Sequence, residues 1–274
     1  MQLRLDKFLA DAGYGTRSEV KQLIRRGEVL VDGKRASGPE QKVDITQNSV
    51  TVSGETVFYE PLSYYILNKP EGVLSASRDG REKTVVDLIP EPKRRDLFPV
   101  GRLDRDTTGL LLITNDGKLS NRLMAPGKHV PKTYRATVEG TLPENLAELF
   151  AAGVDIGDDR PTAPATVVIL DGTDDDSIEG SVIPAGDNGD EEADRSGVMS
   201  TETASSPADP ITHQVELTIT EGRYHQVKRM FEAVGCHVTG LERIRIADLT
   251  LPQELPRGSV LKITYEELMA RLGI

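Results

Sequence analysis

The chain has 274 residues, which suggests one or two domains, and its 37% hydrophobic residues are enough for a core over most of its length. No apolar run is long enough to span a bilayer and no signal-peptide pattern follows Met1, so a membrane protein is excluded. The single Cys236 allows no intrachain disulfide and indicates a reducing, cytoplasmic location. We expect Cys236 to be a small buried filler, and the few His and Cys residues have no spacing typical of a zinc site.

The net charge of −11 is a property of one segment of the chain. Twelve acids and one base, Arg195, lie between Asp171 and Asp209, whereas the rest of the chain has 32 bases and 32 acids. The segment has almost no aromatic residues and no calcium-loop spacing, so we expect a flexible, disordered insert at about 172–210. The acidic balance therefore does not exclude an RNA-binding surface elsewhere.

The N-terminal residues predict a small helical and stranded module. A helix is expected over residues 5–10, followed by a break at Gly13 to Gly15. A second helix is expected from Arg17 to Arg26, with Thr16 and Glu19 as a capping box and Gly27 as the C-terminal cap. Strands are expected at residues 29–31 and near residues 50–52.

Basic residues are frequent in this module, with eight bases against five acids between Arg4 and Arg35. Arg17, Lys21 and Arg25 recur at every fourth position and form a stripe opposite the apolar helix face. The stripe is either a solvated face or a phosphate-contacting surface, and composition alone leaves the two open. The candidate RNA-binding residues of the module are Arg4, Lys7, Arg17, Lys21, Arg25 and Arg26.

The strings Arg-Leu-Asp-Lys-Phe-Leu from Arg4, Thr-Arg-Ser from Thr16 and Ile-Arg-Arg-Gly-Glu-Val-Leu-Val-Asp-Gly-Lys from Ile24 resemble the S4 RNA-binding domain. The resemblance implies an S4 domain over residues 1–60 and favours RNA as the ligand of the basic stripe. It implies a class of ligand and no activity.

The remaining residues, 61–274, alternate between strand and helix patterns. Strands are expected at residues 64–69, 110–114, 132–138, 167–170, 213–220, 241–246 and 259–263. Helices are expected at residues 84–89, 118–124, 142–154, about 223–234 and 265–272. Before the strand at Leu110 lies a polar loop with two acids and two arginines, bracketed by Gly101 and Gly109.

Four motifs in this part resemble the pseudouridine synthases, in particular the ribosomal small-subunit synthase A type. They are Lys-Pro-x-Gly from Lys69, Gly-Arg-Leu-Asp-x-Asp-Thr-x-Gly-Leu from Gly101, Lys-Thr-Tyr from Lys132 and Gly-Arg-Tyr-His-Gln-Val-Lys-Arg-Met from Gly222. The resemblance implies an α+β fold, in which a mostly antiparallel mixed sheet flanked by helices follows the S4 domain.

The resemblance also implies roles for single residues. Asp104 is the expected catalytic carboxylate, Tyr134 stacks on the target uracil, and Lys228 pairs with Asp104. Lys69 and Pro70 support the loop from beneath. Further RNA-binding candidates are Arg102, Arg223, His225, Gln226 and Arg229. Arg102 is either an RNA contact or the partner of Asp106, and the sequence favours neither.

The implied reaction breaks the bond between uracil N1 and ribose C1′ and rejoins the base through C5, so we expect no cofactor and no metal. The carboxylate acts as nucleophile at C1′ or as base at C2′, and the sequence does not separate the two. The expected substrate is ribosomal RNA, of the 16S type, bound by a monomer.

Three alternatives remain open. The first is a sister synthase that acts on 23S rRNA, and the second is a non-catalytic assembly factor that binds RNA. The third is a metal-dependent nuclease that uses Asp104, Asp106 and Asp116.

Overall fold

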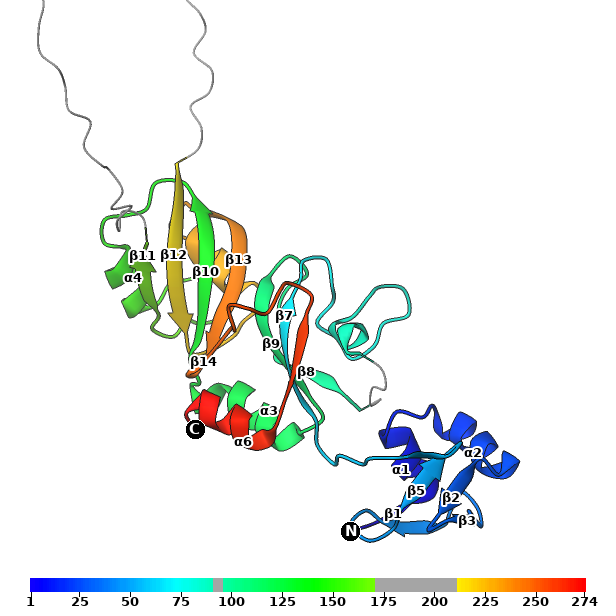
Figure 1. Ribbon diagram of the computed structural model, residues 1–274. Helices are drawn as coiled ribbons and strands as arrows, with labels where there is room; N and C mark the ends of the chain where they lie inside the picture. Colours follow the sequence, from blue (N-terminus) through cyan, green and yellow to red (C-terminus); the bar gives the residue numbers. More distant parts are fainter. Residues whose placement is uncertain (91–95, 171–210) are drawn as a thin grey trace, which may run out of the picture.

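The computed structural model describes residues 1–90, 96–170 and 211–274 (Figure 1). The acidic insert expected at about 172–210 lies outside the described residues. Within the described part of the chain, no helix is long and apolar enough to cross a membrane.

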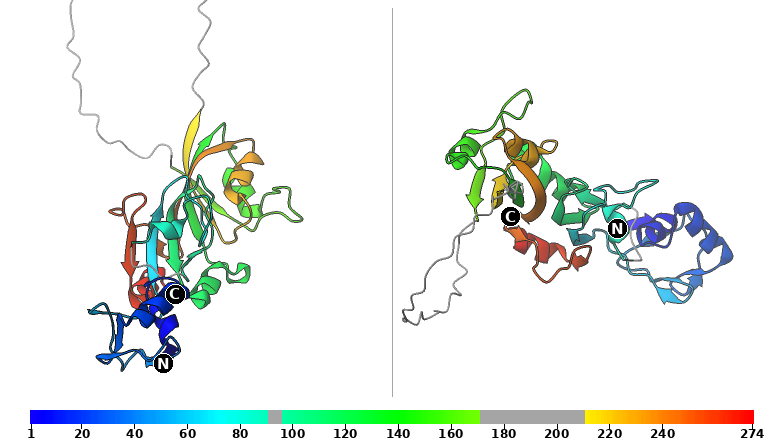
Figure 2. Two further views of the ribbon diagram at one scale, coloured as in Figure 1. Left: turned by 90° about the vertical axis from the view of Figure 1, so that its right-hand side faces the viewer. Right: turned by 90° about the horizontal axis from the view of Figure 1, so that it is seen from above.

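The first sixty residues form an N-terminal module with its own hydrophobic core. Its helices are α1 (Leu5–Asp11) and α2 (Arg17–Arg26), and its strands are β1 (Gln2–Arg4), β2 (Val29–Val31), β3 (Lys34–Arg35), β4 (Lys42–Asp44), β5 (Val50–Val52) and β6 (Glu55–Thr56). All buried residues of this core lie between Leu3 and Val57. In Figures 1 and 2 the module lies beside the rest of the molecule and is joined to it by an extended segment.

The expected caps of α2 are confirmed. The Thr16 side chain accepts a hydrogen bond from Glu19 N at 3.1 Å, and the Glu19 carboxylate accepts one from Thr16 N. Gly27 ends the helix in the left-handed conformation with φ of 82°. Val20 and Ile24 are buried in the module core, so the opposite face, with Arg17 and Arg25, is exposed.

The second part of the chain is built around one large mixed sheet. Its strands are β7 (Tyr64–Lys69), β8 (Phe98–Val100), β9 (Thr108–Thr114), β10 (Lys132–Glu139), β11 (Thr166–Ile169), β12 (Thr212–Ile219), β13 (His237–Ile246), β14 (Leu249–Thr250) and β15 (Val260–Ile263). Its helices are α3 (Gly117–Met124), α4 (Leu146–Ala152), α5 (Gln226–Glu232) and α6 (Tyr265–Leu272), with short 3-10 turns η1 (Val85–Leu88) and η2 (Pro126–Lys128).

The sheet follows the order β11-β12-β10-β13-β9-β7-β15, with β14 paired to β13 and β8 to β9. Every pairing in it is antiparallel except that of β13 with β9. The expected α+β fold with a mostly antiparallel mixed sheet is therefore confirmed.

The parallel contact between β13 and β9 is short and joins two halves of the sheet. Only two residue pairs form it, Glu242 with Thr108 and Arg243 with Gly109. In one half, α4 and α5 pack on β10 and β12 around Phe150 and Phe231, whose rings meet edge to face at 5.2 Å. In the other half, β9 is buried along its whole length, since α3 and α6 cover one face and η1 with its flanking loops covers the other (Figure 1).

The expected elements are observed with some shifted ends. The helix predicted over residues 142–154 begins only at Leu146, because Pro143 lies in a turn whose carbonyl accepts from Leu146 N at 3.0 Å. The strand predicted from Leu241 begins earlier, at His237, because Val238 pairs with Val138 of β10. Cys236 is buried in the core around α5, as expected of a filler.

Candidate active site

The loop Gly101–Thr107 connects β8 to β9 at the point where the two halves of the sheet meet. Ser75 fixes its backbone, because the Ser75 hydroxyl donates to Leu103 O at 2.8 Å and lies 3.1 Å from Leu103 N. Thr107 N donates to Asp104 O at 3.2 Å and closes a turn. Leu103 is buried in the core, whereas the Asp104 side chain is 34% exposed. The loop therefore presents Asp104 to solvent from a fixed backbone.

Lys69, at the end of β7, holds the same loop from beneath. Its side chain is fully buried, and its ammonium donates to the carbonyl oxygens of Pro70, Arg105 and Thr107 at 3.1, 3.2 and 2.9 Å. Burial lowers the pKa of Lys69 to about 8, against the opposing effect of the loop carboxylates. The supporting role expected of Lys69 is confirmed by these contacts.

The start of α5 reaches the loop from the other half of the sheet. His225 Nε2 lies 3.5 Å from Asp104 Oδ1, and Lys228 Nζ donates to Asp106 Oδ2 at 2.6 Å. The Lys228 hydrogen bond holds the pKa of Asp106 below its usual value, although partial burial opposes this. His225 has φ of 48°, a backbone conformation that is uncommon outside glycine and often marks functional sites.

The pairing of Lys228 with Asp106 differs from the one implied by the family resemblance, which pairs Lys228 with Asp104. His225 and Lys228 are three residues apart and lie on the same side of the first helical turn. Asp104 and Asp106 are two residues apart in the facing loop. The two side chains from α5 therefore each meet one acid, and His225 takes the position beside Asp104.

Tyr134 lies on β10 next to this loop. It is directly opposite Arg243 of β13, and Arg243 in turn pairs with Gly109 at the start of β9. The Tyr134 side chain is half-buried and packs against both the core around α5 and the core that contains Leu103. The sheet thus brings Tyr134 to the same junction as Asp104.

A polar cavity of about 410 Å³ opens beside the Lys228–Asp106 pair. Thr108 and Glu242, where β9 and β13 meet, line it together with polar residues of β10 and β12. Asp104 and Tyr134 are not among its lining residues.

Three of the expected RNA-binding residues of the last motif are used within the chain. Arg223 bonds to the carbonyl oxygens of residues 160 and 161 at 2.7 Å and to Glu221 at 3.1 Å. Arg229 bonds to Asp158 at 2.6 Å and to the carbonyl oxygen of Ile156. Gln226 is buried, and its amide bonds to Arg223 N and Glu221. These side chains hold the loop at residues 156–161 against α5. Because their hydrogen-bonding groups are largely used within the chain, they are poorly placed to bind a ligand.

The basic residues of the N-terminal module divide into two groups. Arg4 pairs with Asp6 and Glu40, Lys7 pairs with Asp11, and Arg26 pairs with Glu28. Within the described ranges, Arg17, Lys21 and Arg25 form no salt bridge, although the charge of Arg17 contributes to lowering the pKa of Asp6. The stripe on α2 is therefore one part of the module whose cations are not held in salt bridges.

Arg102 is exposed and has no ion pair with the described residues, so the salt bridge to Asp106 considered from the sequence is not formed. The acids of the nuclease alternative are not brought together either. Asp116 caps α3 beyond the far end of β9 and bonds to Tyr64 at 3.0 Å, away from Asp104 and Asp106.

Two residues at the junction were not selected from the sequence. One is Ser75, which lies in an unremarkable loop, and the other is Arg243, which is 2% exposed and donates to Leu110 O at 2.8 Å. In the sequence, Arg243 is marked only by being a charged residue within a strand that also carries apolar residues.

Comparison with known proteins agrees with this arrangement. A family model described as RNA pseudouridylate synthase matches residues 63–233, and a model of the S4 domain matches residues 3–49. The chain belongs to the RNA pseudouridine synthases that carry an N-terminal S4 domain. It is accordingly an isomerase that acts on RNA.

The similarity extends over nearly the whole chain. "Ribosomal small subunit pseudouridine synthase A" of Vibrio cholerae is 35% identical over 97% of this chain and 98% of its own length. "Uncharacterized RNA pseudouridine synthase YtzG" of Bacillus subtilis is 41% identical over 97% of both chains. A solved structure titled "Crystal structure of pseudouridylate synthase" has 32% identity and a TM-score of 0.59, covering 98% of this chain and 99% of that one.

Proposed function

We propose that this protein isomerises one uridine of 16S ribosomal RNA, of the uridine-516 type, and works as a cytoplasmic monomer. The observation that supports the choice of RNA is the similarity to small-subunit synthases over 97% of the chain. The loop, Tyr134 and α5 all belong to one chain, so no second copy is needed to complete the site. In this proposal residues 1–60 form the RNA-binding domain and residues 61–274 form the catalytic domain.

Asp104 is proposed as the catalytic carboxylate. It attacks C1′ or removes the C2′ proton, and the bond from C1′ to N1 breaks with its electron pair on the uracil. The base then turns and C5 bonds to C1′. In the first route this displaces the Asp104 carboxylate from C1′, and in the second route C2′ regains its proton from Asp104. The C5 proton then leaves and N1 takes up a proton. The fixed backbone beneath Asp104, held by Lys69 and Ser75, keeps the carboxylate in place during these steps.

Tyr134 is proposed to stack on the target uracil. Lys228 is proposed to neutralise the charge of Asp106, which lies two residues from Asp104 in the same loop, through its hydrogen bond to that carboxylate. The target base must leave its RNA helix, which costs a few kcal/mol. Arg102 is exposed and has no acid to pair with among the described residues, so it is free to contact the RNA backbone there. On the N-terminal domain, Arg17, Lys21 and Arg25 are proposed to contact phosphates.

The proposal is tested by carbodiimide-modified primer extension across 16S and 23S rRNA. Cells that lack the protein are compared with cells rescued by the wild type or by Asp104→Asn. We expect one stop in 16S rRNA that is absent without the protein and restored only by the wild type. A stop restored in 23S rRNA would contradict the 16S assignment, and restoration by Asp104→Asn would contradict the role of Asp104.

A further inference from the structure

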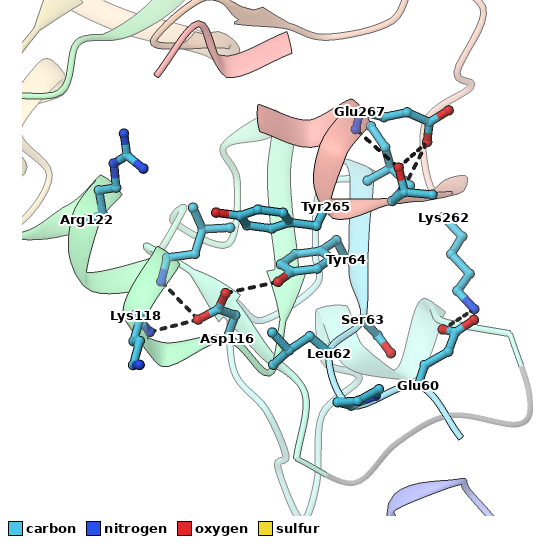
Figure 3. A pocket seen from close by; sticks show the side chains of 14 residues that line it. Glu60, Leu62, Ser63, Tyr64, Asp116, Lys118, Arg122, Lys262, Tyr265 and Glu267 are labelled. Atoms are coloured by element: carbon cyan, nitrogen blue, oxygen red, sulfur yellow. Dashed lines mark hydrogen bonds and ion pairs between the residues drawn. The ribbon is translucent and has the colours of Figure 1, made fainter. Parts of the chain in front are cut away.

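A second cavity lies at the opposite end of β9 from the catalytic loop. Its volume is about 920 Å³, within the range of small-ligand sites. We call it the linker pocket, because Pro61, Leu62 and Ser63, between the N-terminal module and β7, form one of its walls. The starts of α3 and α6 form the other walls (Figure 3). None of the residues assigned to the reaction lines it.

The linker pocket contains an exposed aromatic ring on a rigid base. Tyr265, the first residue of α6, is 44% exposed, and Figure 3 shows its hydroxyl pointing toward α3. Its ring lies 5.7 Å from that of Tyr64, which is buried. Tyr64 is itself fixed by a hydrogen bond from its hydroxyl to Asp116 at 3.0 Å. The solvent-exposed face of the Tyr265 ring is therefore a preformed surface on which another flat ring can stack.

The pocket is lined by three acids and three bases, but the acids are compensated within the chain. Asp116 and Glu267 cap the N-termini of α3 and α6, where the helix dipole favours negative charge. Glu60 is paired with Lys262 at 2.6 Å. By contrast, Lys118 and Arg122 on α3 are exposed and have no ion-pair partner among the described residues. The charged side chains of the pocket that lack a partner are therefore the two cations, Lys118 and Arg122.

An exposed ring and two free cations suit a ligand that is both flat and anionic. We propose that the linker pocket binds a nucleotide of the substrate RNA that flanks the target uridine. Its base stacks on Tyr265 and its phosphate meets Lys118 and Arg122, as is usual for single-stranded RNA on protein. This inference rests on the RNA substrate of the proposed function.

The position of the pocket fits this occupant. Five residue steps of the β7–β9 ladder, from Lys69–Gly109 to Tyr64–Thr114, separate the catalytic loop from the pocket. This is about 17 Å along the strand, which is too far for the target base itself. The wall at residues 61–63 leads directly into the N-terminal module, whose free stripe on α2 is the other proposed RNA surface. An acidic peptide would satisfy the two cations but would leave the exposed ring unused.

The test measures binding of a fluorescein-labelled oligouridine to the full chain by fluorescence anisotropy, at several salt concentrations. We expect Tyr265→Ala to weaken the affinity about tenfold, because a base–aromatic stack contributes that much. Tyr265→Phe keeps the ring and should bind as the wild type does. Arg271→Ala, on the same helix but outside the pocket, is the matched control and should also bind normally.

Removal of both cations by Lys118→Ala with Arg122→Ala tests the phosphate contact separately. The slope of log affinity against log salt should fall by about 0.7 for each contact removed. Both side chains are exposed, so this variant decides the question if Tyr265→Ala lowers the melting temperature. Wild-type affinity in Tyr265→Ala, or an unchanged salt slope in the double variant, would overturn the proposal and leave a protein partner as the occupant. A primer-extension stop in 23S rather than 16S rRNA would contradict the proposed function but would not affect this proposal for the linker pocket.

Discussion

Gly109→Ala should disrupt the contact on which both halves of the site depend. Gly109 has φ of 97°, and an added Cβ would overlap Arg243 O and lie 2.7 Å from Glu242 Cγ. Rotation of a side chain cannot relieve the clash with a backbone carbonyl, so β13 must move away from β9. Two residue pairs, the bond from Arg243 to Leu110 O and a longer bond of 3.4 Å from the Thr108 hydroxyl to Leu241 O join these strands.

The expected size of this effect follows from its two parts. Backbone strain at a positive φ costs roughly 1–3 kcal/mol, and overpacking against a fixed neighbour costs roughly 1–3 kcal/mol more. We therefore expect the free energy of unfolding to fall by about 4 kcal/mol, a large share of a typical domain's stability.

The assay for Gly109→Ala is urea denaturation followed by circular dichroism, with Gly117→Ala as the matched control. Gly117 begins α3 and has nothing within 4 Å of an added Cβ, so its replacement should leave stability unchanged or raise it by up to about 1 kcal/mol. A free energy of unfolding of Gly109→Ala within about 1 kcal/mol of the wild-type value would contradict this expectation, since it would show that β13 can move away from β9 at little cost.

Three further predictions concern charged side chains. Lys132 is 8% exposed and lies near the buried Arg243, and neither side chain has an acidic partner in the described ranges. Burial, together with repulsion from the Arg243 charge, lowers the pKa of Lys132. Lys132→Met should therefore raise the free energy of unfolding, measured in urea, by about 1 kcal/mol, and a decrease would argue against this repulsion. Burial lowers the pKa of Lys69 from 10.5 to about 8, so its charge destabilises the fold in full below pH 8 and this penalty is relieved as the pH rises toward 10.5. The stability of the wild type relative to Lys69→Met should therefore rise across that window, and a flat difference would contradict it. Lys228→Met should raise the pKa of Asp106, measured by carbon NMR, and an unchanged pKa would show that the Lys228–Asp106 bond does not persist in solution.

Local signals in the sequence predicted some elements to the residue. The capping box at Thr16 and the glycine at position 27 act within one helix, so both ends of α2 could be read directly. The start of α6 at Tyr265 agrees with the predicted range, and in the structure Thr264 and Glu267 form its capping box. These features depend only on neighbours in the chain, which explains why they could be predicted without knowledge of the fold.

The contacts of the site depend on residues far apart in the sequence and could not be predicted in this way. Arg223 and Arg229 form part of a basic motif that suggests RNA contacts, but apart from Glu221 their acidic and carbonyl partners lie about 60 to 70 residues earlier. In the structure Lys228 pairs with Asp106 and His225 lies beside Asp104. These pairings depend on how α5 faces the loop across the junction of β9 and β13. The motifs identified the parts of the site, whereas only the sheet register shows how they meet.

The catalytic role of Asp104 in the isomerisation is the main functional proposal. It is tested most directly by tritium release from a 16S rRNA transcript labelled at C5 of uridine, because the C5 proton leaves only when the new bond forms. We expect tritium release by the wild type and none by Asp104→Asn, with equal RNA affinity and an equal melting temperature for the two proteins. Tritium release by Asp104→Asn at the wild-type rate would contradict it.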